Sequence, residues 1–163
     1  MGIKNIEKKS LIKLAGLILL CELVGIIGSL FTVKSSMVWY KELIKPFFTP
    51  PNWIFAPIWI LLYLLMGISL YIITEAKNSD IKKQAIIAFS IQLFLNALWT
   101  PAFFGFKALI GSTIIIFLLL ISIFITFYKF YKISPESSYL LIPYILWVSF
   151  AAGLNLSIML MNI

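Results

Sequence analysis

Five apolar runs of about twenty residues each follow one another along the chain. A run of 18 or more apolar residues is long enough to cross the hydrocarbon core of a bilayer as a helix. A membrane β-barrel would instead show shorter segments in which apolar and polar residues alternate. The runs therefore predict an all-α membrane protein built as a bundle of five transmembrane helices. Their bounds are about 11–33, 53–74, 84–104, 108–130 and 139–163.

The polar stretches between these runs are short, so we expect residues 1–163 to form a single membrane domain. The chain has no histidine and one cysteine, Cys21. Without histidine, Ser-His catalysis and the commonest zinc and haem ligands are excluded, and one cysteine allows neither an intrachain disulfide nor a cysteine metal cluster. We therefore expect no metal site and no required cofactor.

The formal net charge of +7 is carried by lysine, because the chain has no arginine. Most lysines lie in the N-terminal segment and in the turns at 75–83 and 131–138. The positive-inside rule then predicts a multi-pass protein of the cell membrane with a cytoplasmic N-terminus. The connection at 34–52 and the C-terminus would lie on the outer side. Lysines beside membrane spans favour contact with anionic membrane lipids, so we do not expect nucleic acid as a partner. The outer side carries only Lys34, Lys41, Lys45 and Lys107.

One carboxyl group, that of Glu22, lies near the middle of the first run. At helical spacing Glu22 shares a face with Gly25, Ser29 and Thr32, and such a small, polar face should look toward other helices. An acidic residue at mid-membrane depth is a candidate functional residue. The alternative is a neutral carboxyl group that is hydrogen-bonded to a neighbouring helix.

Three later runs each carry a face that combines aromatic side chains with a few polar groups. Together these faces predict an aromatic-lined cavity that would take a flat, weakly polar ligand by stacking. The alternative is a packed interior without a cavity. The fourth run is uniformly aliphatic, so we expect it to face lipid or a second copy of the chain. The inward residues are Trp59 and Tyr63 in the second run, Gln92, Asn96, Trp99 and Phe103 in the third, and Tyr144, Trp147, Ala151 and Asn155 in the fifth.

The connection between the first and second runs is aromatic and rich in proline. Pro46, Pro50 and Pro51 restrict their own backbone and that of the residues before them, so the segment should be rigid. We expect Trp39–Asn52 to cover the cavity. The alternative is an interfacial aromatic belt that anchors the bundle.

Four motifs follow one another along the chain: WYKELIKPFFTPPNW, PIWILLYLLMG, QLFLNALWTPAFFG and PYILWVSFAAGLN. In this order they resemble those of the TspO/translocator protein family, also called tryptophan-rich sensory proteins or peripheral-type benzodiazepine receptors. The resemblance implies a five-helix bundle, often dimeric, with a ligand pocket beneath the first long loop. The resemblance implies ligand contacts at Trp39, Tyr40, Trp59, Asn96, Trp99, Trp147 and Ala151, to which the inward faces add Tyr63, Phe103 and Asn155.

The resemblance implies a membrane receptor or binding protein for porphyrins such as protoporphyrin IX and haem-like tetrapyrroles. It also implies isoquinoline- or benzodiazepine-type ligands and a role in tetrapyrrole or stress regulation. One alternative is porphyrin breakdown by photo-oxidation that depends on Trp59 and Trp147, and another is a small transporter of tetrapyrroles or lipids. Because no acid–base or metal apparatus is present, we expect a binding protein and not an enzyme, with a homodimer as its assembly.

Overall fold

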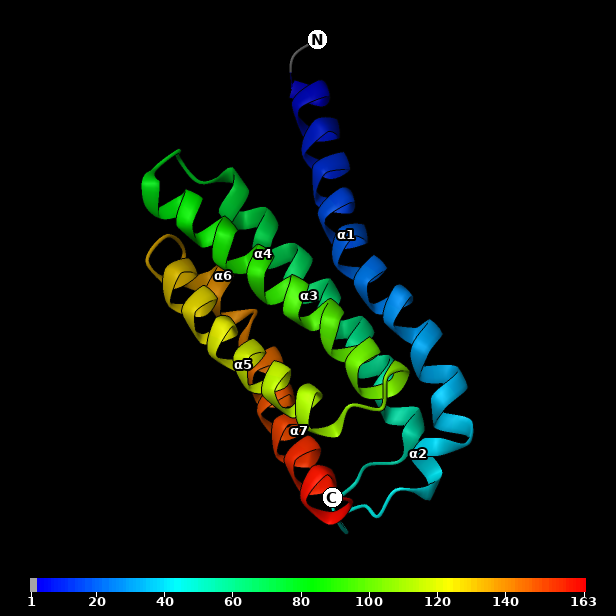
Figure 1. Ribbon diagram of the computed structural model, residues 1–163. Coiled ribbons are helices and arrows are strands. Elements are labelled where there is room, and N and C mark those ends of the chain that lie inside the picture. The colour runs from blue at the N-terminus through cyan, green and yellow to red at the C-terminus, as the bar shows by residue number, and fades with distance from the viewer. Residues whose placement is uncertain (1–2) are drawn as a thin grey trace.

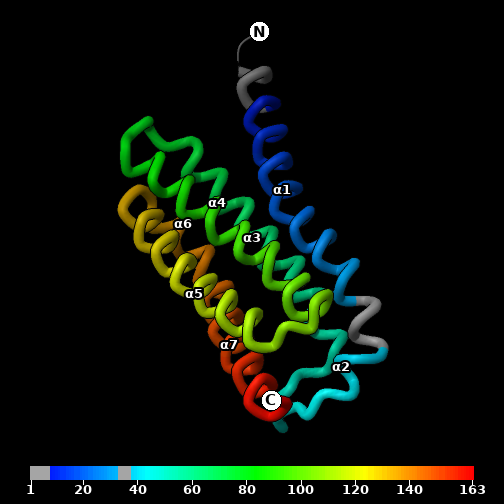
Figure 2. The backbone as a smooth tube through the Cα atoms, in the orientation of Figure 1, coloured from blue at the N-terminus to red at the C-terminus, as the bar shows by residue number. Residues whose placement is uncertain are grey.

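The computed structural model describes the backbone of residues 3–163 and the side chains of residues 8–32 and 38–163 (Figures 1 and 2). Lys34 was predicted to lie in the connection at 34–52, but the first long helix continues to Met37 and includes it, and its side chain lies outside the described ones. Five of the helices in this part of the chain are long and apolar enough to cross a membrane, which confirms the predicted fold class. They are α1 (Ile3–Met37), α3 (Phe55–Glu75), α4 (Asp80–Thr100), α5 (Leu109–Tyr131) and α7 (Ile142–Met161).

Short helical elements join the long ones. They are α2 (Trp39–Glu42), the 3-10 turn η1 (Asn52–Ile54), the π turn η2 (Pro101–Gly105) and α6 (Pro135–Tyr139). The third span begins earlier than residue 84, because the Ser79 side chain accepts a hydrogen bond from the backbone N–H of Lys82 and caps α4. The fifth span is divided into α6 and α7.

The long helices form a ring. Helix α1 packs against α3 and α4, α4 packs against α5, α5 packs against α7, and α3 packs against α6, which leads into α7. Figure 1 shows the N-terminus and the C-terminus at opposite ends of the bundle, as an odd number of spans requires. The connection that contains α2 lies at the same end as the C-terminus.

Helices α1 and α3 approach each other most closely at glycines. A Cβ atom added to Gly67 would lie 2.6 Å from the Cα atom of Ile18, and one added to Gly25 would lie 2.5 Å from the ring of Tyr63. Both distances are too short for non-bonded carbon atoms, so only glycine permits this crossing. Small residues at helix–helix contacts allow such an approach in membranes, where the hydrophobic effect does not drive helices together.

A hydrogen-bonded chain of polar side chains occupies the centre of the ring. The Tyr63 hydroxyl donates to Asn96 Oδ1 at 2.7 Å, and Asn96 Nδ2 donates to the Tyr144 hydroxyl at 2.7 Å. That hydroxyl in turn donates to Gln92 Oε1 at 3.0 Å. Three helices, α3, α4 and α7, are therefore joined through groups that have no access to water.

The expectation for the fourth run is correct for one face only. Helix α5 exposes Ile114, Leu118 and Ile121, but its opposite face is buried against α4 and α7. The buried face carries hydroxyl groups whose polarity is masked, because they donate to carbonyl groups of their own helix. An example is Thr126, which donates to the Ser122 carbonyl oxygen at 2.8 Å.

Candidate functional site

A cavity of about 400 Å³ lies between α1, α3 and the end of α4, with α2 and η1 at one end. This volume falls in the usual range of small-molecule sites, about 300–1,000 Å³. Most of the lining is aromatic or aliphatic. Helix α1 contributes Glu22, Gly25, Ile26, Gly28, Ser29 and Thr32, and the other elements contribute Tyr40, Asn52, Phe55, Ala56, Trp59, Ile60, Tyr63, Trp99, Thr100 and Phe104.

Four of the predicted ligand contacts lie on the cavity wall: Tyr40, Trp59, Tyr63 and Trp99. Trp59 and Tyr63 lie one turn apart on α3, and their rings stack with centroids 5.4 Å apart and an interplanar angle of 28°. A hydrogen bond fixes the orientation of the Trp99 indole, because its Nε1 donates to Asn155 Oδ1 at 2.9 Å. The wall therefore presents broad aromatic surfaces whose orientation is fixed before any ligand arrives.

Asn155 positions Trp99 and does not line the cavity. Its Nδ2 donates to Thr113 Oγ1 at 2.8 Å, so the amide joins α4, α5 and α7. Its side chain is 2% exposed. The contribution of α5 to this arrangement was not predicted, because a single threonine in an aliphatic helix gives no periodic signal.

The connection after α1 covers one end of the cavity and is tied down at several points. Lys45 Nζ donates to the carbonyl oxygens of Tyr40 at 2.6 Å and Leu43 at 2.9 Å. The Asn162 side chain, at the end of α7, accepts from the backbone N–H of Ile44 at 2.9 Å and donates to its carbonyl oxygen at 2.8 Å. The Lys45 bonds stabilise the loop internally, and the end of α7 holds the loop from a distant part of the sequence.

Tyr40 and Asn52 are the residues of this cover that line the cavity, and Tyr40 is the aromatic one. Its ring packs on Phe104 with centroids 5.6 Å apart, and the residue is 6% exposed. The Tyr40 hydroxyl is neutral at physiological pH, as for any tyrosine, and burial raises its pKa further above that range, so it can donate a hydrogen bond.

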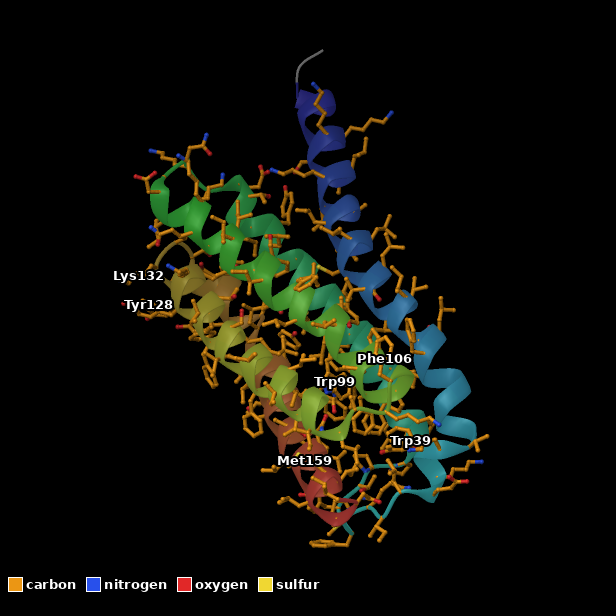
Figure 3. All side chains as sticks on the ribbon, viewed as in Figure 1. Trp39, Trp99, Phe106, Tyr128, Lys132 and Met159 are labelled. Atoms are coloured by element: carbon orange, nitrogen blue, oxygen red, sulfur yellow. The ribbon has the colours of Figure 1, made fainter. Side chains whose placement is uncertain are left out.

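Trp39 and Phe103 join the cover to η2, the turn that follows α4. Their rings meet edge to face with centroids 5.6 Å apart, and Phe103 is 2% exposed. Lys107 Nζ lies 5.8 Å above the Trp39 ring. Figure 3 shows Trp39, on α2, in the same half of the bundle as Trp99. Neither Trp39 nor Phe103 is on the cavity wall, and a ligand contact at either residue stays a prediction.

Trp147, Ala151 and Asn96 also lie away from the cavity. The Trp147 ring is not on the cavity wall but packs against Phe55, a lining residue, with centroids 5.6 Å apart. Ala151 is 8% exposed and belongs to the apolar core. Asn96 is 2% exposed and bonded to two tyrosines. Ligand contacts at these positions likewise stay predictions.

Some lining residues were missed from the sequence. Phe55 precedes Trp59 by one helical turn, so extending the aromatic face of α3 toward its start would have included it. Thr100 follows Asn96 by one helical turn and so lies on the polar face of the third run, although it was not named as a ligand contact. Ala56 and Phe104 carry no comparable signal, because small or adjacent residues line a cavity only through the way the helices pack.

The cavity has a lateral opening. Ile26 of α1 and Ile60 of α3 both line it, yet they are 58% and 60% exposed. Both residues lie within membrane-spanning segments, so the opening faces the bilayer and not the aqueous phase. An apolar ligand dissolved in the membrane could therefore reach the site without crossing the loop.

Glu22 lines the cavity, as do Gly25, Ser29 and Thr32 of the predicted polar face. Among the described side chains, none forms a hydrogen bond or ion pair with the Glu22 carboxyl group. The alternative of a carboxyl bonded to a neighbouring helix thus finds no partner in this part of the chain.

Comparison with known proteins gives a consistent result. The model of the TspO/MBR family matches residues 17–161. The chain is 39% identical to the tryptophan-rich protein TspO of Chlorobaculum tepidum, over 94% of this chain and 98% of that protein. It is 42% identical to the protein of the same name from Archaeoglobus fulgidus, over 94% and 99% of the two chains. It is 35% identical to the translocator protein of Bos taurus, over 86% and 84%.

Proposed function

The chain belongs to the TspO/MBR family, and from this membership we propose that it binds porphyrins and other flat aromatic molecules in the cavity between α1 and α3. It is a multi-pass membrane protein of the sensory and binding type. Protoporphyrin IX and haem-like tetrapyrroles are the natural ligands that we propose. Isoquinoline- and benzodiazepine-type compounds are proposed as synthetic ligands of the same site.

The observation that carries the proposal is the shape and chemistry of the cavity wall. Trp59 and Tyr63 form a stacked pair on one side, and Trp99 presents a second ring whose indole nitrogen is already bonded to Asn155. Flat conjugated molecules gain dispersion and stacking energy on such surfaces. A ring whose orientation is already fixed loses little side-chain entropy when the ligand binds.

The lateral opening supports a ligand that partitions into the bilayer. Porphyrins and synthetic aromatic ligands are apolar enough to enter from the membrane past Ile26 and Ile60. The proposal includes the cell membrane as the location, the N-terminus in the cytoplasm, and a homodimer, for which the lysine distribution and the family resemblance are the support.

Replacing Trp59 with alanine should weaken protoporphyrin IX binding by about tenfold or more, because a stacked aromatic contact contributes about 1–3 kcal/mol. The measurement is a titration of purified protein in detergent, followed by the shift of the porphyrin absorption band. Trp53→Ala is the matched control, since Trp53 is 73% exposed and is not on the cavity wall.

The control should keep the affinity of the wild type. An equal loss in Trp53→Ala and Trp59→Ala would point to binding at the protein surface. Unchanged affinity in Trp59→Ala would contradict the proposed site.

A further inference from the structure

The Glu22 carboxyl group lies at the end of the cavity away from the loop. Glu22 and Thr32 both line the cavity and lie about 15 Å apart along α1. Tyr40 and Asn52 line the opposite end. The cavity thus has an apolar middle, a loop-covered outer end and a single carboxyl group at its inner end.

This carboxyl group lacks a counter-ion within the described part of the chain. Lys13, which precedes it on α1, pairs with Glu75 at 2.7 Å. Lys45 Nζ donates hydrogen bonds to carbonyl oxygens of the loop, and Lys107 Nζ lies over the Trp39 ring. A carboxyl group at membrane depth without a partner is costly, so a ligand that supplies a partner gains binding energy there.

The uncharged side chains near Glu22 do not donate a hydrogen bond to its carboxyl group either. The Tyr63 hydroxyl donates to Asn96 at 2.7 Å, and the Ser29 hydroxyl donates to the Ile26 carbonyl oxygen at 2.7 Å. Cys21 is fully buried, and its thiol is only a weak donor. These two hydroxyl groups therefore donate to other acceptors and not to the Glu22 carboxyl group.

The cavity wall near Glu22 is suited to an aromatic ligand that carries a positive charge. Tyr63 and Trp59 line the same cavity, with the Tyr63 ring against Gly25, one turn from Glu22, and aromatic ring faces attract cations as well as other rings. A carboxylate combined with aromatic faces in a cavity is the chemistry that recognises protonated amines and amidines. Anionic groups of a ligand would be repelled from this end and would lie toward the loop.

We propose that Glu22 determines the specificity of the site, by binding a protonated amine or amidine group of a flat aromatic ligand. This inference rests on the proposed function, because it assumes that the cavity is the ligand site. It adds a chemical class, aromatic cations, to the neutral and anionic ligands proposed above. It also fixes the orientation of the bound ligand, whose cationic nitrogen lies at Glu22.

The test compares two tricyclic probes of nearly the same shape near neutral pH: 9-aminoacridine, which is a cation there, and acridine, which is neutral. Binding to the full-length protein in detergent is followed by probe fluorescence, with empty micelles subtracted. The wild type should bind 9-aminoacridine about ten- to a hundredfold more tightly than acridine, as a charge-assisted hydrogen bond allows.

Glu22→Gln should abolish this preference, and Glu22→Asp should keep most of it. Glu42→Gln is the matched control, because it removes the same charge from an exposed residue of α2 that does not line the cavity. Equal affinity of the wild type for both probes, or a preference that survives Glu22→Gln, would overturn the inference. If Glu22→Gln does not fold, the inference is tested by the preference of the wild type for 9-aminoacridine and by whether Glu22→Asp keeps most of that preference.

Protoporphyrin IX is titrated in parallel to separate the two proposals. A wild type that shows the Glu22-dependent preference but does not bind protoporphyrin IX would refute the porphyrin proposal and support the role of Glu22. Porphyrin binding without any preference for the cationic probe would refute the role of Glu22 alone.

Discussion

Replacing Asn96 with leucine should lower the free energy of unfolding by about 2–4 kcal/mol. The substitution removes the acceptor of the Tyr63 hydroxyl and the donor to the Tyr144 hydroxyl, both at 2.7 Å. Tyr144 keeps its bond to Gln92, but the Tyr63 hydroxyl loses its acceptor, and an unsatisfied buried group costs about 1–3 kcal/mol. Thermal unfolding in detergent, followed by circular dichroism, measures the change.

A double variant separates this hydrogen-bonding role from a simple packing defect. Tyr63→Phe in the wild type removes one hydrogen bond, whereas in the Asn96→Leu background it removes a hydroxyl that already lacks its partner. The second change should therefore cost less than the first or restore some stability. If Asn96→Leu is as stable as the wild type yet loses porphyrin binding, Asn96 contacts the ligand directly, and the structural role argued for it is contradicted.

Replacing Gly67 with alanine should weaken both the fold and ligand binding. The new Cβ would lie 2.6 Å from the Ile18 Cα atom, which is backbone and can move only if α1 moves. Overpacking of this kind costs about 1–3 kcal/mol. Because α1 forms one wall of the cavity, its displacement should also lower the affinity for protoporphyrin IX, measured by the same titration as for Trp59.

Glycines with free space around them provide the controls. A Cβ atom on Gly16 in α1 or on Gly153 in α7 would meet nothing within 4 Å. Alanine at either position should leave stability unchanged or raise it by about 0.5–1 kcal/mol, since glycine is the poorer helix former. Equal stability of Gly67→Ala and these controls would show that α1 and α3 do not cross as closely as described.

Much of the fold could be predicted from the sequence because the bilayer restricts the choices. Runs of this length must be helices, and five of them place the termini at opposite ends of the bundle. The helix ends were harder to predict from the sequence, because a single side chain such as Ser79 decides where α4 begins. The proline-rich connection was correctly placed over one end of the cavity, where Tyr40 and Asn52 line it.

The candidate site was only partly predictable, for a geometrical reason. Periodicity shows which face of a helix looks inward, but the interior of a five-helix ring contains both a cavity and a packed core. Trp59 and Trp147 were both predicted to face inward, yet only Trp59 borders the open volume, and the Trp147 ring packs against the lining residue Phe55. Which inward residues line the cavity depends on how α1 packs on α3, and periodicity does not contain that information.

The role of Asn155 illustrates the same limit. Its place on an inward face suggested a ligand contact, but its amide is used by Trp99 and Thr113. Thr113 belongs to the helix that was expected to face lipid or a second copy. A buried amide in a membrane needs partners, and the sequence does not say whether a ligand or a neighbouring helix supplies them.

Binding of flat aromatic ligands between α1 and α3 is best tested by an experimental structure of the protein with bound protoporphyrin IX. We expect ligand density in contact with Trp59, Tyr63 and Trp99, beneath Tyr40. Density against Trp147 and α7, with the space between α1 and α3 empty, would contradict it.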